Sequence, residues 1–120
     1  MADRVLLITW GATIPGREER SLEVFNDALG LYGRMQQEGR IESFDVVLLD
    51  PNAGIQGYIE LHGTHEQLDA AQQDEDFRAT MLDASLVVEN LSGVEGVTNE
   101  ALGSEIALYQ EAIGKLPQPV

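Results

Sequence analysis

The order of its secondary-structure patterns is the feature that most constrains how this chain folds. The segment "RVLLITW" (4–10) is a short apolar run with β-branched residues, which predicts a strand rather than a helix. The chain-breaking segment "GATIPG" follows it. From Arg17 to Glu38, apolar residues then recur every three or four positions, which predicts a long amphipathic helix. Gly39 is expected to end this helix, because glycine commonly closes the last helical turn.

Two strands and a second helix are predicted next. The strands cover residues 41–50 and 55–62, and the turn "PNAG" joins them. Thr64 and Gln67 have the spacing of a capping box, in which each side chain bonds the other residue's backbone N–H group. The helix that they begin is expected to be interrupted around "QQDED" and to resume at Phe77.

A fourth strand and a last helix complete the predicted order. We expect the strand at 85–91 ("SLVVENL") and the helix at about 100–114, after the break "SGVEG". The order βαββαβ plus a helix predicts one α+β domain over residues 1–120, with its core at about 4–98. Two split βαβ units of this kind close into a four-stranded antiparallel sheet with both helices on one face.

The helix-free face of that sheet is predicted to be apolar. Both sides of the first strand carry large apolar residues, with Val5 and Leu7 on one side and Leu6 and Ile8 on the other. A sheet face in water shows polar alternation instead, and each large side chain left exposed forgoes about 1.5–3 kcal/mol of burial. Soluble monomers rarely expose such a surface. We therefore expect a homodimer formed sheet against sheet; the alternative cover is the C-terminal helix folding back.

Composition excludes several classes of function. The chain has 21 acidic and 7 basic residues, a formal charge of −14, and its basic residues are scattered. Nucleic acid and anionic membranes repel such a surface, so we expect neither as a partner. The absence of cysteine excludes disulfides, thiolate chemistry and iron–sulfur clusters. No apolar run approaches the roughly 20 residues of a membrane helix, and no signal-peptide pattern is present, so a cytoplasmic location is expected.

One strand carries the candidate catalytic residues. The segment "GYIELHG" (57–63) alternates strictly, with Tyr58, Glu60 and His62 on one side. His62 and Glu60 are the candidate catalytic pair, because a histidine next to a carboxylate can act as a general acid or base. The alternative is a polar sheet face without a function. Trp10, Phe44 and Tyr58 are the candidate ligand-binding residues, as an aromatic wall for a flat organic molecule; their alternative role is in the core of an interface.

The two histidines do not predict a metal site. His62 and His65, with Glu60 or Glu66, resemble part of a metal cluster, but no third ligand follows at a recognisable spacing. We therefore expect no metal and no cofactor. Binding of haem through His62 remains an alternative.

The patterns together resemble those of the dimeric α+β barrel superfamily. The resemblance covers about residues 4–98 and rests on "VLLITW", the long helix, the "VVLLDPNAG" and "GYIEL" hairpin, "THEQLDAAQQDEDFR" and "SLVVENL". It implies a ferredoxin-like fold, a homodimer formed face to face, and a pocket between helix and sheet or inside the barrel. The antibiotic-biosynthesis-monooxygenase-like and YCII-like branches are the most similar.

The YCII-like branch pairs a histidine of the first strand with an aspartate of an acidic helix motif. The comparable segment here, "QQDEDF", offers Asp74 and Asp76. The first strand, however, contains no histidine, and Trp10 is its only side chain of similar bulk. The chemistry of that branch is therefore not carried over to this chain.

The superfamily includes enzymes, ligand sensors and proteins without an assigned activity, so the resemblance does not settle the function. We expect a small homodimer that binds a small apolar or aromatic metabolite or acts as an accessory subunit. The alternative is a cofactor-independent monooxygenase or isomerase acting on an aromatic or polyketide-like substrate. In that enzyme His62 would transfer a proton and Glu60 would orient His62. Tyr58 and Trp10 would hold the aromatic ring of the substrate.

Overall fold

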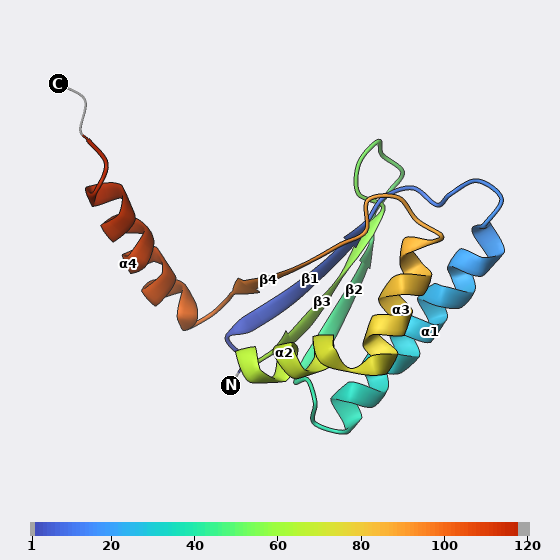
Figure 1. The fold of residues 1–120 in the computed structure, drawn as a ribbon, viewed down its shortest axis with the longest axis horizontal. Helices are drawn as coiled ribbons and strands as arrows, with labels where there is room; N and C mark the ends of the chain where they lie inside the picture. Colours follow the sequence, from blue (N-terminus) through green and yellow to red (C-terminus); the bar gives the residue numbers. More distant parts are fainter. Residues whose placement is uncertain (1, 118–120) are drawn as a thin grey trace.

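The computed structural model describes residues 2–117 as a four-stranded antiparallel sheet with helices on one face (Figure 1). The strands lie in the order β2-β3-β1-β4. The elements are β1 (Arg4–Trp10), α1 (Glu18–Gln37), β2 (Ser43–Leu48), β3 (Gly57–Gly63), α2 (His65–Gln73), α3 (Glu75–Ser85), β4 (Ser92–Val97) and α4 (Ala101–Gly114). The predicted α+β fold with an antiparallel sheet is confirmed.

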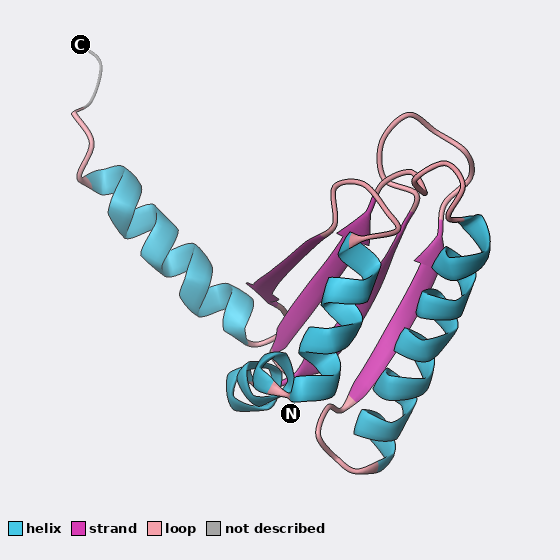
Figure 2. Cartoon of the chain, turned by 45° about the vertical axis from the view of Figure 1, so that its right-hand side comes forward, coloured by secondary structure: helices cyan, strands magenta, loops and turns pink. Residues whose placement is uncertain are grey.

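The core lies between the sheet and the helices α1, α2 and α3 (Figure 2). Alternate residues of β1 and β3 point into it, because successive side chains of a strand face opposite ways. Leu6 and Leu61 are directly opposite each other and almost fully buried. They pack with Tyr32 and Met35 of α1 and Leu68 of α2. Burying each such side chain contributes about 1.5–3 kcal/mol, so this layer fixes which sheet face the helices cover.

The predicted signals at the helix ends are confirmed. Gly39 has a φ of +74° directly after the end of α1, a conformation that glycine adopts at little cost. Thr64 and Gln67 form the capping box at the start of α2. Asp74 separates α2 from α3, and its carboxylate accepts a 3.1 Å hydrogen bond from the backbone N–H of Phe77. The pKa of Asp74 is lower than its usual value, mainly because of this hydrogen bond and secondly because of the hydrogen bond from the Arg40 guanidinium.

The predicted position of the fourth strand is wrong. Residues 85–91 do not join the sheet, and β4 is Ser92–Val97, paired antiparallel with β1. Val87 and Val88 are instead buried against Val24 of α1, and Val88 forms an isolated bridge with Thr13. The apolar run therefore marks a buried connection. The glycine-containing "SGVEG" forms an edge strand, where a single neighbouring strand supplies the backbone partners.

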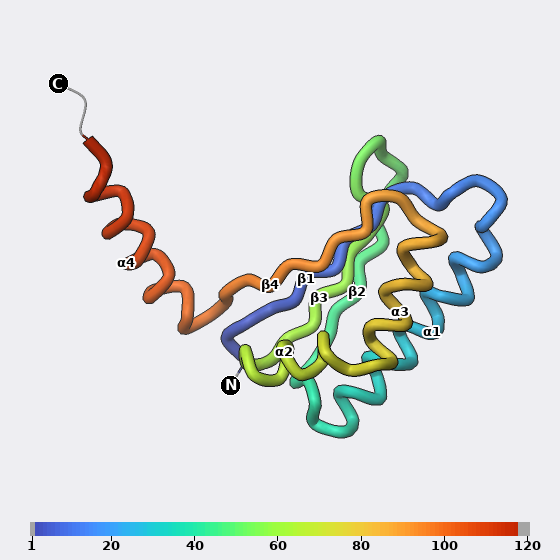
Figure 3. The backbone as a smooth tube through the Cα atoms, in the orientation of Figure 1, coloured from blue at the N-terminus to red at the C-terminus, as the bar shows by residue number. Residues whose placement is uncertain are grey.

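The helix α4 extends away from the rest of the chain (Figures 1 and 3). None of its described residues is buried, and it does not cover the sheet of its own chain. Its exposed large apolar residues are Leu102, Ile106, Leu108, Tyr109 and Ile113. Among residues 2–117, no helix combines the length and the apolar character that crossing a membrane requires.

Candidate functional site

The strand β3 places three predicted site residues on the helix-free face of the sheet. Tyr58, Glu60 and His62 are half-buried there, whereas Ile59 and Leu61, between them in the sequence, are buried in the core. Tyr58 lies opposite Thr9 of β1 and Val47 of β2. The predicted row therefore exists, and it is flanked by strands on both sides.

The register of the hairpin adds Asp45 to this row. Asp45 of β2 is directly opposite Glu60 of β3. The Nε2 atom of His62 lies 3.0 Å from Oδ2 of Asp45 and 3.3 Å from Oε2 of Glu60. Asp45 was not among the predicted site residues. Only the β2–β3 register could have indicated it, and the connection between these strands is too long to define the register from sequence.

Trp10 and Phe44 lie on the other face of the sheet, which the helices cover. The Trp10 ring packs edge-on against Phe25, with 5.9 Å between ring centroids, and Phe44 packs edge-on against Tyr32 at 6.1 Å. The five predicted residues are thus divided between two faces. A ligand held against Trp10 of one chain is separated by the sheet from His62 of the same chain.

Trp10 borders a cavity of about 60 Å³ between the sheet and the helices α1 and α3. Its walls are mostly apolar, and the hydroxyl-bearing residues among them are Ser21, Tyr32 and Thr80. Burial raises the pKa of Tyr32 to about 12, so its phenol stays neutral and can donate a hydrogen bond. The other lining residues are Ile8, Val24, Phe25, Ala28, Ile59, Met81, Ala84, Val87, Val88 and Leu91.

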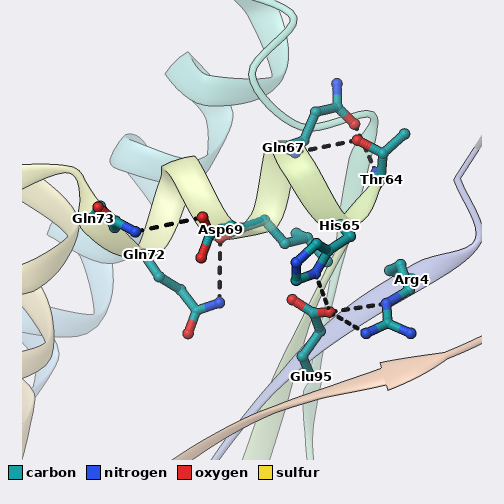
Figure 4. A network of polar contacts seen from close by, with 9 residues as sticks. Arg4, Thr64, His65, Gln67, Asp69, Gln72, Gln73 and Glu95 are labelled. Carbon is teal, nitrogen blue, oxygen red and sulfur yellow. Dashed lines mark hydrogen bonds and ion pairs between the residues drawn. The ribbon is translucent and has the colours of Figure 1, made fainter.

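The second histidine belongs to a different cluster (Figure 4). Nδ1 of His65, at the start of α2, lies 2.8 Å from Oε2 of Glu95 in β4, and Nε of Arg4 donates a 2.8 Å hydrogen bond to the same oxygen. The hydrogen bond to Glu95 raises the pKa of His65. Burial raises the pKa of Glu95, but its bonds to His65 and Arg4 outweigh this and lower it overall. The structure does not bring His62 and His65 together.

Similarity to known proteins was found among solved structures. A dimeric protein of unknown function and ferredoxin-like fold from Bacteroides fragilis is 13% identical, with a TM-score of 0.59, covering 78% of this chain and 95% of its own. The chain has the ferredoxin-like fold. No protein-family model and no curated protein matches its sequence.

Two further structures with this fold differ in description and coverage. A candidate antibiotic biosynthesis monooxygenase from Caulobacter crescentus is 11% identical, with a TM-score of 0.56, covering 80% of this chain and 88% of its own. A protein of unknown function from Nitrosomonas europaea is 16% identical, with a TM-score of 0.60, covering 99% of this chain and 98% of its own. At these identities the likeness establishes the ferredoxin-like fold alone.

Proposed function

We propose that the protein binds a small apolar or aromatic molecule in the cavity beside Trp10. The apolar lining of that cavity is the observation that carries the proposal. Ligand sites are typically apolar hollows with a few polar groups that orient the ligand. Trp10 and Phe25 supply aromatic surface, and the neutral phenol of Tyr32 supplies a hydrogen-bond donor.

The volume of the cavity limits what can enter. At about 60 Å³, it is smaller than the engineered cavity of about 150 Å³ that holds benzene. A ring can enter only if a lining side chain moves. Met81 of α3 is the side chain best suited to do so, because methionine is unbranched and adopts several rotamers at low cost. We infer that the ligand is no larger than about one ring.

Binding is favoured over catalysis by the chemistry of the lining. None of the described residues around the cavity carries a carboxylate, an imidazole or an amine, and Tyr32 is the one titratable group. General acid–base catalysis needs a group whose pKa lies near the working pH, which the pKa of about 12 at Tyr32 does not provide. The predicted enzyme would use His62 and Trp10 on one substrate, and the sheet separates these two residues.

The test uses the fluorescence of Trp10, the single tryptophan of the chain. Benzene and phenol are titrated into the protein, and saturable changes in Trp10 emission are expected. Ala84→Leu places a larger side chain at the cavity wall and should weaken binding at least tenfold. Ala79→Leu is the matched control, because Ala79 lies on the same helix but is exposed to solvent. Equal binding by both variants would refute the cavity as the site.

We also propose that the protein works as a homodimer in which the helix-free sheet faces meet. Val5, Leu7, Val47 and Val94 are the apolar residues of that face. Val94 is 57% exposed in the single chain, so a second copy would remove apolar surface from water. The similar structure from Bacteroides fragilis is described as dimeric, which supports this assembly. The exposed apolar side of α4 is a further surface that the second copy can cover.

A further inference from the structure

We propose that Asp45, Glu60 and His62 bind one divalent transition-metal ion on the helix-free face of the sheet. All three ligands come from one chain, on the neighbouring strands β2 and β3. The proposal is independent of the apolar cavity, which lies on the other face, and the three ligands share the helix-free face with Val5, Leu7 and Val47.

The first argument is electrostatic. Asp45 and Glu60 are directly opposite each other across the β2–β3 pair, an arrangement that is destabilising for like charges. Within residues 2–117, neither carboxylate forms an ion pair with lysine or arginine, and His62 is the ion-pair partner of both. The chain as a whole carries a formal charge of −14, which raises the local concentration of cations. A metal ion between the two carboxylates would offset their repulsion.

The second argument is geometric. Metal–ligand bonds of about 2.1 Å place neighbouring donor atoms about 3.0 Å apart in octahedral and about 3.4 Å apart in tetrahedral coordination. The observed distances from Nε2 of His62 are 3.0 Å to Asp45 and 3.3 Å to Glu60, and the three ligand atoms lie within 4.8 Å of one another. The two spacings from His62 are thus those expected of donors to one ion, and the third donor atom lies within the same small cluster.

The ligand types indicate the class of metal. An imidazole nitrogen suits Zn²⁺, Co²⁺ and other first-row ions, whereas Mg²⁺ and Ca²⁺ prefer oxygen ligands alone. In the single chain the side chain of His62 is 22% exposed and that of Asp45 is 70% exposed. In the proposed dimer the exposed side of this site would face the partner's sheet. Three protein ligands leave at least one coordination position for water.

The cluster around His65 provides an internal comparison. It also combines a histidine with a carboxylate, but Arg4 already donates to the Glu95 oxygen that His65 contacts. The guanidinium offsets the charge of Glu95 and would repel a metal ion. Replacing His65 is therefore a matched control for replacing His62.

The test is calorimetric titration of the tag-free full chain with Zn²⁺, together with the visible absorption of bound Co²⁺. One ion per chain is expected. Replacing even an outer-shell partner of a metal site typically costs about 10–100-fold in affinity, so His62→Gln and Asp45→Asn should each weaken binding at least tenfold. His65→Gln should bind as the wild type does. Circular dichroism verifies that each variant is folded.

A second measurement separates a true site from an ion pair of His62 with the two carboxylates. Zn²⁺ should raise the melting temperature of the wild type, because a ligand of the folded state stabilises it, but not that of Asp45→Asn. The proposal is overturned if Zn²⁺ binding is not saturable or if His62→Gln binds as tightly as the wild type. Equal weakening by His65→Gln would also overturn it, since binding would then reflect the acidic surface as a whole.

Discussion

Gly57 of β3 lies directly opposite Trp10 of β1, and the indole occupies the space that a side chain at position 57 would need. A Cβ atom there would come within 2.7 Å of Cζ2 of Trp10 and within 2.7 Å of the carbonyl oxygen of Val47. The second contact is with backbone and cannot be relieved by a rotamer change. Gly57 thus allows the aromatic wall of the cavity to lie close against the sheet.

Gly57→Ala is predicted to lower the free energy of unfolding by about 1–3 kcal/mol, the usual cost of overpacking a well-packed site. Urea denaturation measures this difference, and Trp10 emission should change in the folded state. Gly33→Ala is the control, because a Cβ at Gly33 of α1 meets no atom within 4 Å. Alanine there should leave stability unchanged or raise it by up to about 1 kcal/mol. Equal stability of Gly57→Ala and the wild type would contradict the packing described.

Thr64→Ala is predicted to destabilise the protein by about 1 kcal/mol through loss of the cap of α2. The Thr64 hydroxyl accepts a 3.1 Å hydrogen bond from the Gln67 N–H, and the Gln67 side chain accepts a 2.9 Å bond from the Thr64 N–H. Thr64→Ser keeps the hydroxyl and should restore most of the stability. Urea denaturation of the three proteins tests the prediction, which fails if serine and alanine behave alike.

Local chemistry explains which parts of the fold could be predicted from the sequence. The capping box and the end of α1 at Gly39 depend on residues within a few positions of each other. A short stretch of sequence is therefore enough to predict them. Which row of β1 faces inward was not predictable, because Leu6 and Ile8, which the structure buries, alternate with the equally apolar Val5 and Leu7. β4 was not predictable either, since "SGVEG" contains little apolar surface and pairs with β1 through its backbone.

The candidate site depends on contacts between strands, which a sequence pattern does not contain. The alternation of β3 predicted that Tyr58, Glu60 and His62 share a face. It could not show that Asp45 meets them, because a shift of one residue in the β2–β3 register would turn Asp45 to the opposite face. Nor could it show that Trp10 and Tyr58 lie on opposite faces, because that depends on how β1 aligns with β3.

The contact between His65 and Glu95 predicts a pH-dependent part of the stability. The pKa of His65 is raised above its ordinary 6.5 by the hydrogen bond to Glu95. The stabilisation is therefore complete below about pH 6.5 and is lost as the pH rises through the folded-state pKa. The pKa of Glu95 is lowered from 4.5, so its own contribution is lost only when acid protonates it.

Melting temperatures at pH 5.5 and 8.5 test this contribution. The wild type should lose more stability between these two values than His65→Gln does, because the variant lacks the group that titrates. Subtracting the two profiles removes every contribution that the two proteins share. Parallel profiles would show that the His65–Glu95 contact adds nothing to folding.

Val94→Glu is predicted to convert a dimer into single chains. Val94 is 57% exposed on the helix-free face of the edge strand β4. A carboxylate there is solvated in one chain but would lose its water in the proposed assembly. Leu82→Glu is the control, because Leu82 of α3 is 67% exposed on the helix side of the molecule. Light scattering at micromolar concentration should give two chains per particle for the wild type and Leu82→Glu, and one for Val94→Glu. A wild type that scatters as one chain would refute the proposed dimer. Val5, Leu7 and Val47 would then face water.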